Sequence, residues 1–281
     1  MSRSFIIQGH ICHAPEAGSL EIRENAFVIC ADGICRGVFN GVPERFRGLE
    51  IIDCRGKLVM PGMVDLHIHA PQYAYRGTGM DYELLDWLNK VAFPEEIRYE
   101  DAEYAAEAYG IFARKMKRSA TTRAVIFGTV HTDAALILAD RMEKSGLVSF
   151  VGKVSMDRDS MPELTERSVE QAAAEARRFI TESRRRGYRK TGPIVTPRFV
   201  PSCSAGLMAE LGKIRKEYGL PVQSHLSENP DEVELVSRLE PEAAFYGDAY
   251  DRFGLFGREG RTVSSRAVGS EASSSTSASN S

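Results

Sequence analysis

From residue 63 onward, short apolar runs alternate with longer segments in which apolar residues recur every three or four positions. Short runs bounded by glycine or proline are typical of strands, and the longer spacing is typical of helices with one buried face. The runs that predict strands are 63–69, 121–130, 147–156, 192–200 and 220–228. Strands separated by helices run parallel, because parallel neighbours need a crossover, so the pattern predicts a parallel α/β sheet.

The helical segments between these strands carry recognisable start and stop signals. Leu84, Leu85 and Leu88 share one face of a helix that Pro94 should stop. Ser168 and Gln171 have the spacing of a capping box at the start of another helix. Further helices are predicted over 100–118, 133–146 with Asp133 as N-cap, 207–219 and around 233–236. Five βα units suit a doubly wound sheet or a (β/α)₈ barrel, and strand count alone does not choose between them.

Residues 1–62 have a different pattern, in which short β-rich runs are punctuated by glycine and proline. The runs are FIIQGHIC, AFVICADGIC and LEIIDCRGKLVM. Such a pattern predicts a small all-β segment, 1–62, ahead of an α/β region, 63–263.

Composition places the chain among ordinary globular proteins. Of 281 residues, 43% are hydrophobic and 27% charged, and the net charge of −3 favours neither a nucleic-acid nor a membrane partner. The five cysteines show no CxxC spacing, which favours a reducing compartment over a disulfide framework or a thiolate metal site. The first residues lack the apolar stretch of a signal peptide, and no run approaches the roughly 20 apolar residues of a membrane span. We therefore expect a cytoplasmic protein.

Two of the six histidines, His67 and His69, stand one residue apart at the end of the apolar run 63–69. Side chains in a strand alternate between faces, so both imidazoles project to the same side. On the first strand of a barrel they would lie at its C-terminal end, where barrel enzymes have their sites. Two imidazoles on one face can supply two ligands of a tetrahedral metal site. The alternative is a pair of histidines that only cap or hydrogen-bond the core.

The motifs around these histidines resemble a known family. VMPGMVDLHIHA (59–70) resembles the PGxVDxHxH first-strand motif of the amidohydrolase superfamily. HAPQY, LLDWL, FPEE, TPRF and SHLSEN followed by DEVE together resemble the guanine deaminases of that superfamily. The matches extend over residues 61–234, and the likeness reaches to about Val263. It implies a TIM-type barrel behind a small N-terminal sandwich.

The resemblance also implies a site. His67, His69 and His225 would hold one zinc ion, and Glu228 would carry protons during catalysis. Arg198 would hydrogen-bond the purine carbonyl, Phe199 would pack near the ring, and Gln72 would read its polar edge. The implied reaction is hydrolytic deamination of guanine to xanthine and ammonia, in a protein whose intact relatives form homodimers.

Other interpretations of these residues remain open at this point. Glu228 can instead be a carboxylate favoured by the start of a helix. Arg198 can form a surface ion pair, and Phe199 can belong to the core. Four further residues lie near predicted strand or helix ends: Lys153, the His131–Asp133 pair and Cys203. A structural role is favoured for Lys153 and Cys203. His131 and Asp133 can either contact the metal ligands from behind or serve as a helix cap with a nearby polar histidine.

The end of the chain departs from the family pattern. The family carries a fourth histidine on strand six and an aspartate on strand eight, whereas no histidine follows His225 here. Thr262 and Val263 resemble the start of strand six, but nine of the eighteen residues 264–281 are serine. Such a tail is expected to be disordered, because it buries too little surface to offset its ordering entropy. A frame change near residue 263 is one hypothesis, and a designed linker is the alternative.

Three functional interpretations therefore compete. The first is a guanine deaminase by lineage whose activity is impaired by truncation. The second is another amidohydrolase, a deaminase or dechlorinase acting on a related heterocycle. The third is a non-catalytic fragment that pairs with an intact subunit. With about five of eight βα units, the barrel would keep open sheet edges, so aggregation of the isolated chain is expected.

Overall fold

The structure is a computed structural model that describes residues 3–256 and 262–265, with side chains described over 3–256 and at Thr262. The chain divides into two compact units, Met1–Met63 and Val64–Ser281. Each unit is described separately below. Of the serine-rich tail predicted over 264–281, the first two residues belong to a strand, and the rest lies outside the described residues.

The N-terminal unit is a four-stranded sheet with the order β3-β2-β1-β4. Strand β1 pairs antiparallel with β2 and parallel with β4. Asp32 and Gly33 connect β2 to β3 with φ of 55° and 76°, the left-handed pair that a two-residue hairpin turn requires. The strands are β1 (Phe5–His13), β2 (Glu21–Ala31), β3 (Ile34–Phe39) and β4 (Ile51–Val59).

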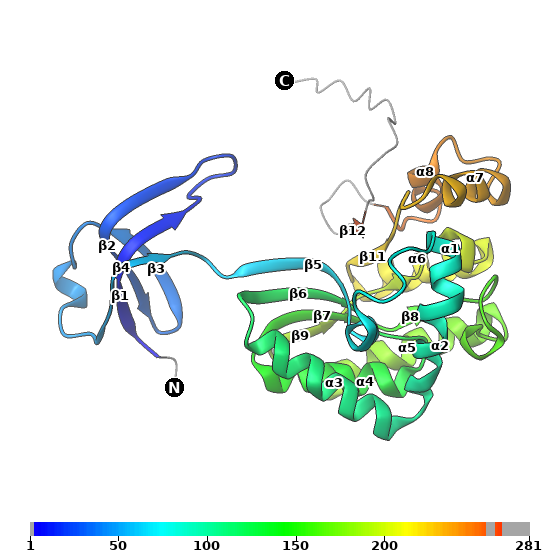
Figure 1. Ribbon diagram of the computed structural model, residues 1–281, viewed down its shortest axis with the longest axis horizontal. Helices are drawn as coiled ribbons and strands as arrows, with labels where there is room; N and C mark the ends of the chain where they lie inside the picture. The colour runs from blue at the N-terminus through cyan, green and yellow to red at the C-terminus, as the bar shows by residue number, and fades with distance from the viewer. Residues whose placement is uncertain (1–2, 257–261, 266–281) are drawn as a thin grey trace. The chain divides into compact units, whose positions relative to one another are not determined.

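The second unit is built around a four-stranded sheet with the order β5-β6-β7-β9 (Figure 1). Strands β6, β7 and β9 are parallel, as the alternation of strands and helices predicts. Two short parallel pairs, β8 with β10 and β11 with β12, continue the arrangement. The strands are β5 (Met63–His69), β6 (Thr121–Phe127), β7 (Val148–Gly152), β8 (Val154–Ser155), β9 (Thr191–Pro193), β10 (Thr196–Pro197), β11 (Val222–His225) and β12 (Thr262–Ser265).

The predicted strands are shorter in the structure, except for β5, which matches its predicted bounds. The runs 147–156 and 192–200 each break into two short strands that pair with different partners. The hydrophobic pattern predicts where apolar segments are buried, whereas ladder pairing depends on neighbours distant in sequence. Strand β12 lies beside β11, with residue 265 opposite His225, as expected for a sixth strand.

Helices separate the strands and pack against one another in chain order, from α3 to α6. Asp101 and Ser168 cap α3 and α5 through their side chains, and Gly219 ends α6 with φ of 65°. The helices are α1 (Leu84–Trp87), α2 (Phe93–Ile97), α3 (Ala102–Lys117), α4 (Thr132–Ser145), α5 (Val169–Arg185), α6 (Ala205–Tyr218), α7 (Pro230–Leu239) and α8 (Tyr246–Asp251). The short turns are η1 (Glu44–Phe46), η2 (Pro71–Tyr75), η3 (Leu88–Ala92), η4 (Arg98–Glu100), η5 (Pro162–Leu164) and η6 (Val200–Ser202).

Two predicted helix boundaries are wrong. Pro94 does not stop the first helix, because the π-type turn η3 carries the chain into α2, where Pro94 lies in the first turn and needs no backbone donor. Asp133 is not the N-cap of α4, since the helix begins at Thr132 after His131. The carboxylate of Asp133 instead accepts a hydrogen bond from Arg178 at 2.7 Å.

The core of the second unit lies between the helices and the sheet. Phe112 from α3, Leu138 from α4, Phe179 from α5 and Leu211 from α6 are all buried in one cluster with Ile126 of β6. Within residues 3–256 and 262–265, no helix combines the length and apolar character needed to cross a bilayer.

Candidate metal centre

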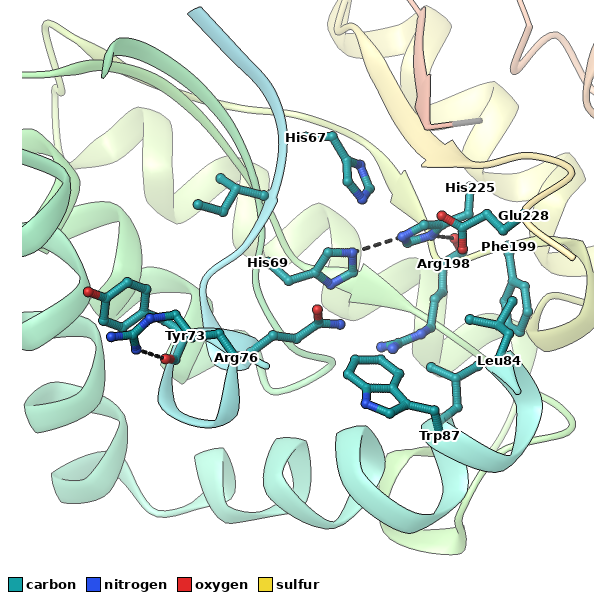
Figure 2. Close-up of a pocket in the computed structure, with 13 residues that line it drawn as sticks. His67, His69, Tyr73, Arg76, Leu84, Trp87, Arg198, Phe199, His225 and Glu228 are labelled. Atoms are coloured by element: carbon teal, nitrogen blue, oxygen red, sulfur yellow. Dashed lines mark hydrogen bonds between the residues drawn. The ribbon is translucent and has the colours of Figure 1, made fainter. Parts of the chain in front are cut away.

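Three imidazoles from two strands meet at one point of the second unit. His67 and His69 end β5, and His225 ends β11. One ring nitrogen from each lies within 4.8 Å of the other two, and Figure 2 shows the three rings facing one another. The shared strand face of His67 and His69, inferred from their spacing, therefore brings both to a third histidine 156 positions away.

The three rings lie on an apolar base formed by Phe127, the last residue of β6. Its ring stacks on His69 at 4.4 Å between centroids and contacts His225 at 4.6 Å. Burial lowers the pKa of His67 to about 4 and that of His225 to about 3, and it holds the pKa of His69 well below its usual value. All three imidazoles are consequently neutral at pH 7, which leaves a lone pair on each ring.

The hydrogen bonds at the centre fit a metal ion. Nδ1 of His225 donates to the carbonyl of Arg198 at 2.6 Å, so the lone pair of its neutral ring is on Nε2. That Nε2 lies 2.8 Å from Nε2 of His69. Ligands placed 2.0–2.1 Å from a tetrahedral zinc ion would be roughly 3.3 Å apart. A hydrogen bond from the other ring N–H to a backbone carbonyl, which orients the ring, is also usual for a metal-binding histidine.

The end of β11 is held by contacts with its neighbours. Tyr250 of α8 donates its hydroxyl to the carbonyl of His225 at 2.8 Å. Beneath the histidines, Nε2 of Gln223 donates to the Ile126 carbonyl and to Oγ1 of Thr196. Gly152 makes room for this polar layer, because an added Cβ would lie 1.9 Å from the Thr196 hydroxyl. These contacts link β6, β10 and β11 below the metal centre.

The three histidines open onto a cavity of about 480 Å³. Gln72, Arg198, Phe199 and Glu228 line the same cavity, so the structure brings all seven predicted site residues together. Its remaining walls are formed by Ile68, Tyr73, Arg76, Leu84, Trp87 and Leu88. In Figure 2, Trp87 and Arg198 approach the cavity from the side opposite His67. The volume is within the range of small-molecule sites.

Arg198 is buried in this wall and forms an ion pair. Its side chain is 3% exposed and forms an ion pair with the fully buried Glu96, with 2.5 Å between Nη1 and Oε2. The guanidinium also lies 4.9 Å from the ring centroid of Phe93. The alternative of a surface ion pair for Arg198 is therefore wrong, because the pair is enclosed. Phe199 is buried in a second apolar cluster, with Phe93 and Phe127, and also lines the cavity.

Glu228 follows β11 on a sharply turned segment. Ser227 has φ of 55°, a left-handed conformation that non-glycine residues adopt mainly where the surroundings enforce it. The backbone N–H of Glu228 donates to the carboxylate of Glu232 at 2.8 Å, and Tyr246 donates to the other oxygen of Glu232 at 2.5 Å. The side chain of Glu228 is partly buried and near enough to His67 to raise the pKa of that ring against the effect of burial.

The other four candidate residues lie outside the cavity wall. Lys153 forms a buried ion pair with Glu166, which agrees with a structural role. His131 precedes α4 without a side-chain cap bond. Cys203 is fully buried, burial raises the pKa of its thiol to about 12, and Sγ donates to the Ser155 carbonyl at 3.2 Å. The thiol therefore packs, as expected.

Sequence reasoning missed three residues of this region. The sequence places Phe127 only within the predicted strand 121–130, three residues before its end, near where strand side chains approach the site. Glu96 and Trp87 stand out in the sequence only as members of the motifs FPEE and LLDWL. The available signal for Glu96 was an acidic residue on the apolar side of a short helix. A buried carboxylate needs a partner, so such a residue indicates a buried ion pair.

Comparison with known proteins identifies the family. The amidohydrolase family model matches residues 58–260. A guanine deaminase of Mus musculus is 48% identical over 197 residues, covering 70% of this chain and 43% of that protein. A guanine deaminase of Dictyostelium discoideum is 36% identical, with coverage of 94% and 62%. The chain thus spans about half the length of the curated relatives it matches.

Solved structures agree with these relatives. The crystal structure of guanine deaminase from C. acetobutylicum with bound guanine in the active site matches with a TM-score of 0.88 and 39% identity. The match covers 93% of this chain and 62% of that one. The α/β unit with its parallel sheet is thus an amidohydrolase fold. The chain belongs to the amidohydrolase family, and the relatives it matches there are guanine deaminases.

Proposed function

We propose that this chain carries the metal-binding and purine-binding residues of a guanine deaminase, which converts guanine and water to xanthine and ammonia. One arrangement carries the proposal: three imidazole nitrogens within 4.8 Å open onto the same cavity as Arg198 and Glu228. The relatives named guanine deaminase supply the substrate class.

His67, His69 and His225 would hold one zinc ion through neutral ring nitrogens. Zinc accepts imidazole ligands readily, and three protein ligands are typical of catalytic zinc sites. The ion, when bound, supplies the Lewis acidity that lets a water molecule lose a proton near neutral pH. The apolar ring of Phe127 beneath the histidines keeps bulk water away from that side.

Glu228 is the proton carrier in this proposal. It takes a proton from the attacking water and gives it to a ring nitrogen next to C2 of guanine, which makes C2 a better electrophile. Bond formation between the water oxygen and C2 is followed by cleavage of the bond between C2 and the amino group. Glu228 then takes the remaining proton of the attacking oxygen and passes it to the amino group, which leaves as ammonia while that oxygen becomes the C2 carbonyl of xanthine. The turn at Ser227 and the hydrogen bond from the backbone N–H of Glu228 to Glu232 fix the backbone that presents the Glu228 carboxylate.

Recognition of the purine falls to three other residues of the wall. Arg198 donates to the ring carbonyl oxygen, and Gln72 offers both a donor and an acceptor to the polar edge. Phe199 packs against the ring. Their shared cavity with the histidines supports these roles.

The finer architecture is part of the same proposal. Residues 63–263 form an incomplete TIM-type barrel with about five of the eight βα units of that fold. Residues 1–62 form an N-terminal β-rich sandwich segment, and 264–281 form a serine-rich tail. We further propose a cytoplasmic protein whose intact relatives are homodimers.

Metal analysis combined with a guanine-to-xanthine assay on the purified chain tests the proposal. We expect about one zinc per chain, formation of xanthine and ammonia in equal amounts, and loss of both activity and zinc after chelation. A chlorotriazine assayed in parallel tests the competing heterocycle hydrolase. A folded, zinc-loaded chain that leaves guanine unchanged would contradict the proposed activity.

A further inference from the structure

We propose that Glu96 is a positioning residue for Arg198, and that its carboxylate fixes the guanidinium in the orientation that selects purines bearing a ring carbonyl. The choice of purine rests on the proposed function. The contact between Glu96 and Arg198 is a feature of the structure itself.

The contact is strong and enclosed. Glu96 is 0% exposed and Arg198 is 2% exposed, and Nη1 lies 2.5 Å from Oε2. The two residues are 102 positions apart and come from α2 and the segment after β10. Removing two charges from water costs several kcal/mol per ion, so an ion pair is a poor way to fill a core. A pair kept at the wall of a cavity therefore indicates a task for the charge.

Backbone and side chain of Arg198 are held by different partners. The backbone N–H donates to the Ser155 carbonyl at 3.3 Å, and the backbone carbonyl accepts from His225 at 2.6 Å. The guanidinium depends instead on Glu96 and on the face of Phe93. Loss of the Glu96 charge should consequently release the side chain without moving the histidine that the carbonyl supports.

The guanidinium retains donors for a ligand. Over the part of the chain that the structure describes, the side-chain hydrogen bond of Arg198 uses Nη1 alone. Arginine has five N–H donors in a rigid plane, and a partner on one edge sets the direction of the others. Because Arg198 lines the cavity, the remaining edge can donate to a carbonyl oxygen there. Glu96 itself is absent from the cavity wall, so it acts through Arg198.

The test compares two purines that differ at this carbonyl. 2-Aminopurine keeps the amino group of guanine but lacks the ring carbonyl, and its fluorescence reports binding directly. Guanine is measured by competition on the full chain loaded with zinc. For Glu96→Gln, we expect the preference for guanine over 2-aminopurine to fall about tenfold or more, the scale of a hydrogen bond to a charged group. Affinity for 2-aminopurine and zinc content should stay near the wild-type values.

Matched variants separate positioning from general damage. Glu95→Gln removes the neighbouring carboxylate of α2, which bonds Arg98 and Tyr104 instead, and should leave the preference unchanged. Glu166→Gln removes a different buried ion pair. It should lower the free energy of unfolding and leave the purine preference unchanged. In the double variant with Arg198→Met, Glu96→Gln should reduce the preference no further, because both changes act on one interaction.

Folding of each variant is checked by circular dichroism. If Glu96→Gln does not fold, Glu96→Asp keeps the charge and withdraws it by one methylene, and it should lose part of the preference. An unchanged preference in a folded Glu96 variant overturns the inference, and so does equal affinity of the wild type for the two purines. Selective binding without turnover would leave the inference standing and defeat only the proposed deaminase activity.

Discussion

Two buried ion pairs lie in the same unit of the molecule and behave as opposites. Arg198 with Glu96 and Lys153 with Glu166 are both almost completely enclosed. The oxygens of Glu166 accept from Lys153 and from the backbone N–H of Met156. Among the described residues, one oxygen of Glu96 has no hydrogen-bond partner, and Arg198 faces the cavity.

The difference shows that burial of a charge does not by itself mark a functional residue. In the Lys153 pair, both oxygens of Glu166 accept hydrogen bonds and neither residue lines the cavity, which suits a structural link between the residue after β7 and the turn before α5. The Arg198 pair keeps unused donors beside the metal centre. Hydrogen-bonding capacity left open toward a cavity distinguishes the functional pair from the structural one.

The largest effect expected on the cavity side is from His225→Asn. Removing one of three imidazoles should lower zinc affinity more than about 100-fold, since loss of a supporting contact alone can cost 10–100-fold. Competition with a chromogenic chelator measures the affinity. His131→Asn is the matched control, because His131 lies outside the three-histidine cluster. The zinc affinity of this variant should match that of the wild type. Equal zinc affinity in the two variants would contradict the three-histidine centre.

Glu228→Gln should separate catalysis from binding in the same region. An amide cannot carry the proton, so we expect turnover of guanine to fall about 10²–10⁴-fold, the usual contribution of general acid–base catalysis. Zinc content and purine affinity should change little. Glu234→Gln, on the exposed side of α7, provides the control. Full turnover in a Glu228→Gln protein would exclude Glu228 as the proton carrier.

Lys153→Met should have the opposite profile. It leaves Glu166 buried without its cation, and breaking a buried pair costs about 3–5 kcal/mol in free energy of unfolding. Denaturant titration measures this loss, and the folded fraction should keep its zinc and its purine preference. The double variant Lys153→Met/Glu166→Gln should recover much of the stability. Loss of zinc from folded Lys153→Met would instead connect Lys153 to the centre.

The smallest effect expected is the pH dependence of that stability loss. Burial raises the pKa of Glu166 even beside Lys153, and removal of the cation should raise it further. A carboxyl whose pKa is raised in the folded state lowers the free energy of unfolding least at low pH, where the group is protonated in both the folded and the unfolded state. The cost of Lys153→Met should therefore grow as the pH rises above the ordinary glutamate pKa. In the double variant this dependence should disappear.

Much of the site could be predicted from local patterns. The bounds of β5 and the shared face of His67 and His69 follow from a two-residue period. The Ser168 cap and the Gly219 end follow from backbone preferences of single residues. His225, Glu228 and Arg198 came from motif resemblance, and their common cavity could not be deduced from spacing because they are far from β5 in the sequence.

The amino-acid sequence by itself determined the alternation of strands and helices, the HxH pair and the family. Those features depend on neighbouring residues and on side-chain period, which are local. Tertiary structure alone decided that Phe127 supports the imidazoles and that Glu96 pairs with Arg198. It also decided that Pro94 lies in the first turn of α2 and that Lys153 pairs with Glu166 away from the cavity. These outcomes depend on which distant groups share a desolvated space, because a buried charge takes whatever partner the packed chain brings within reach.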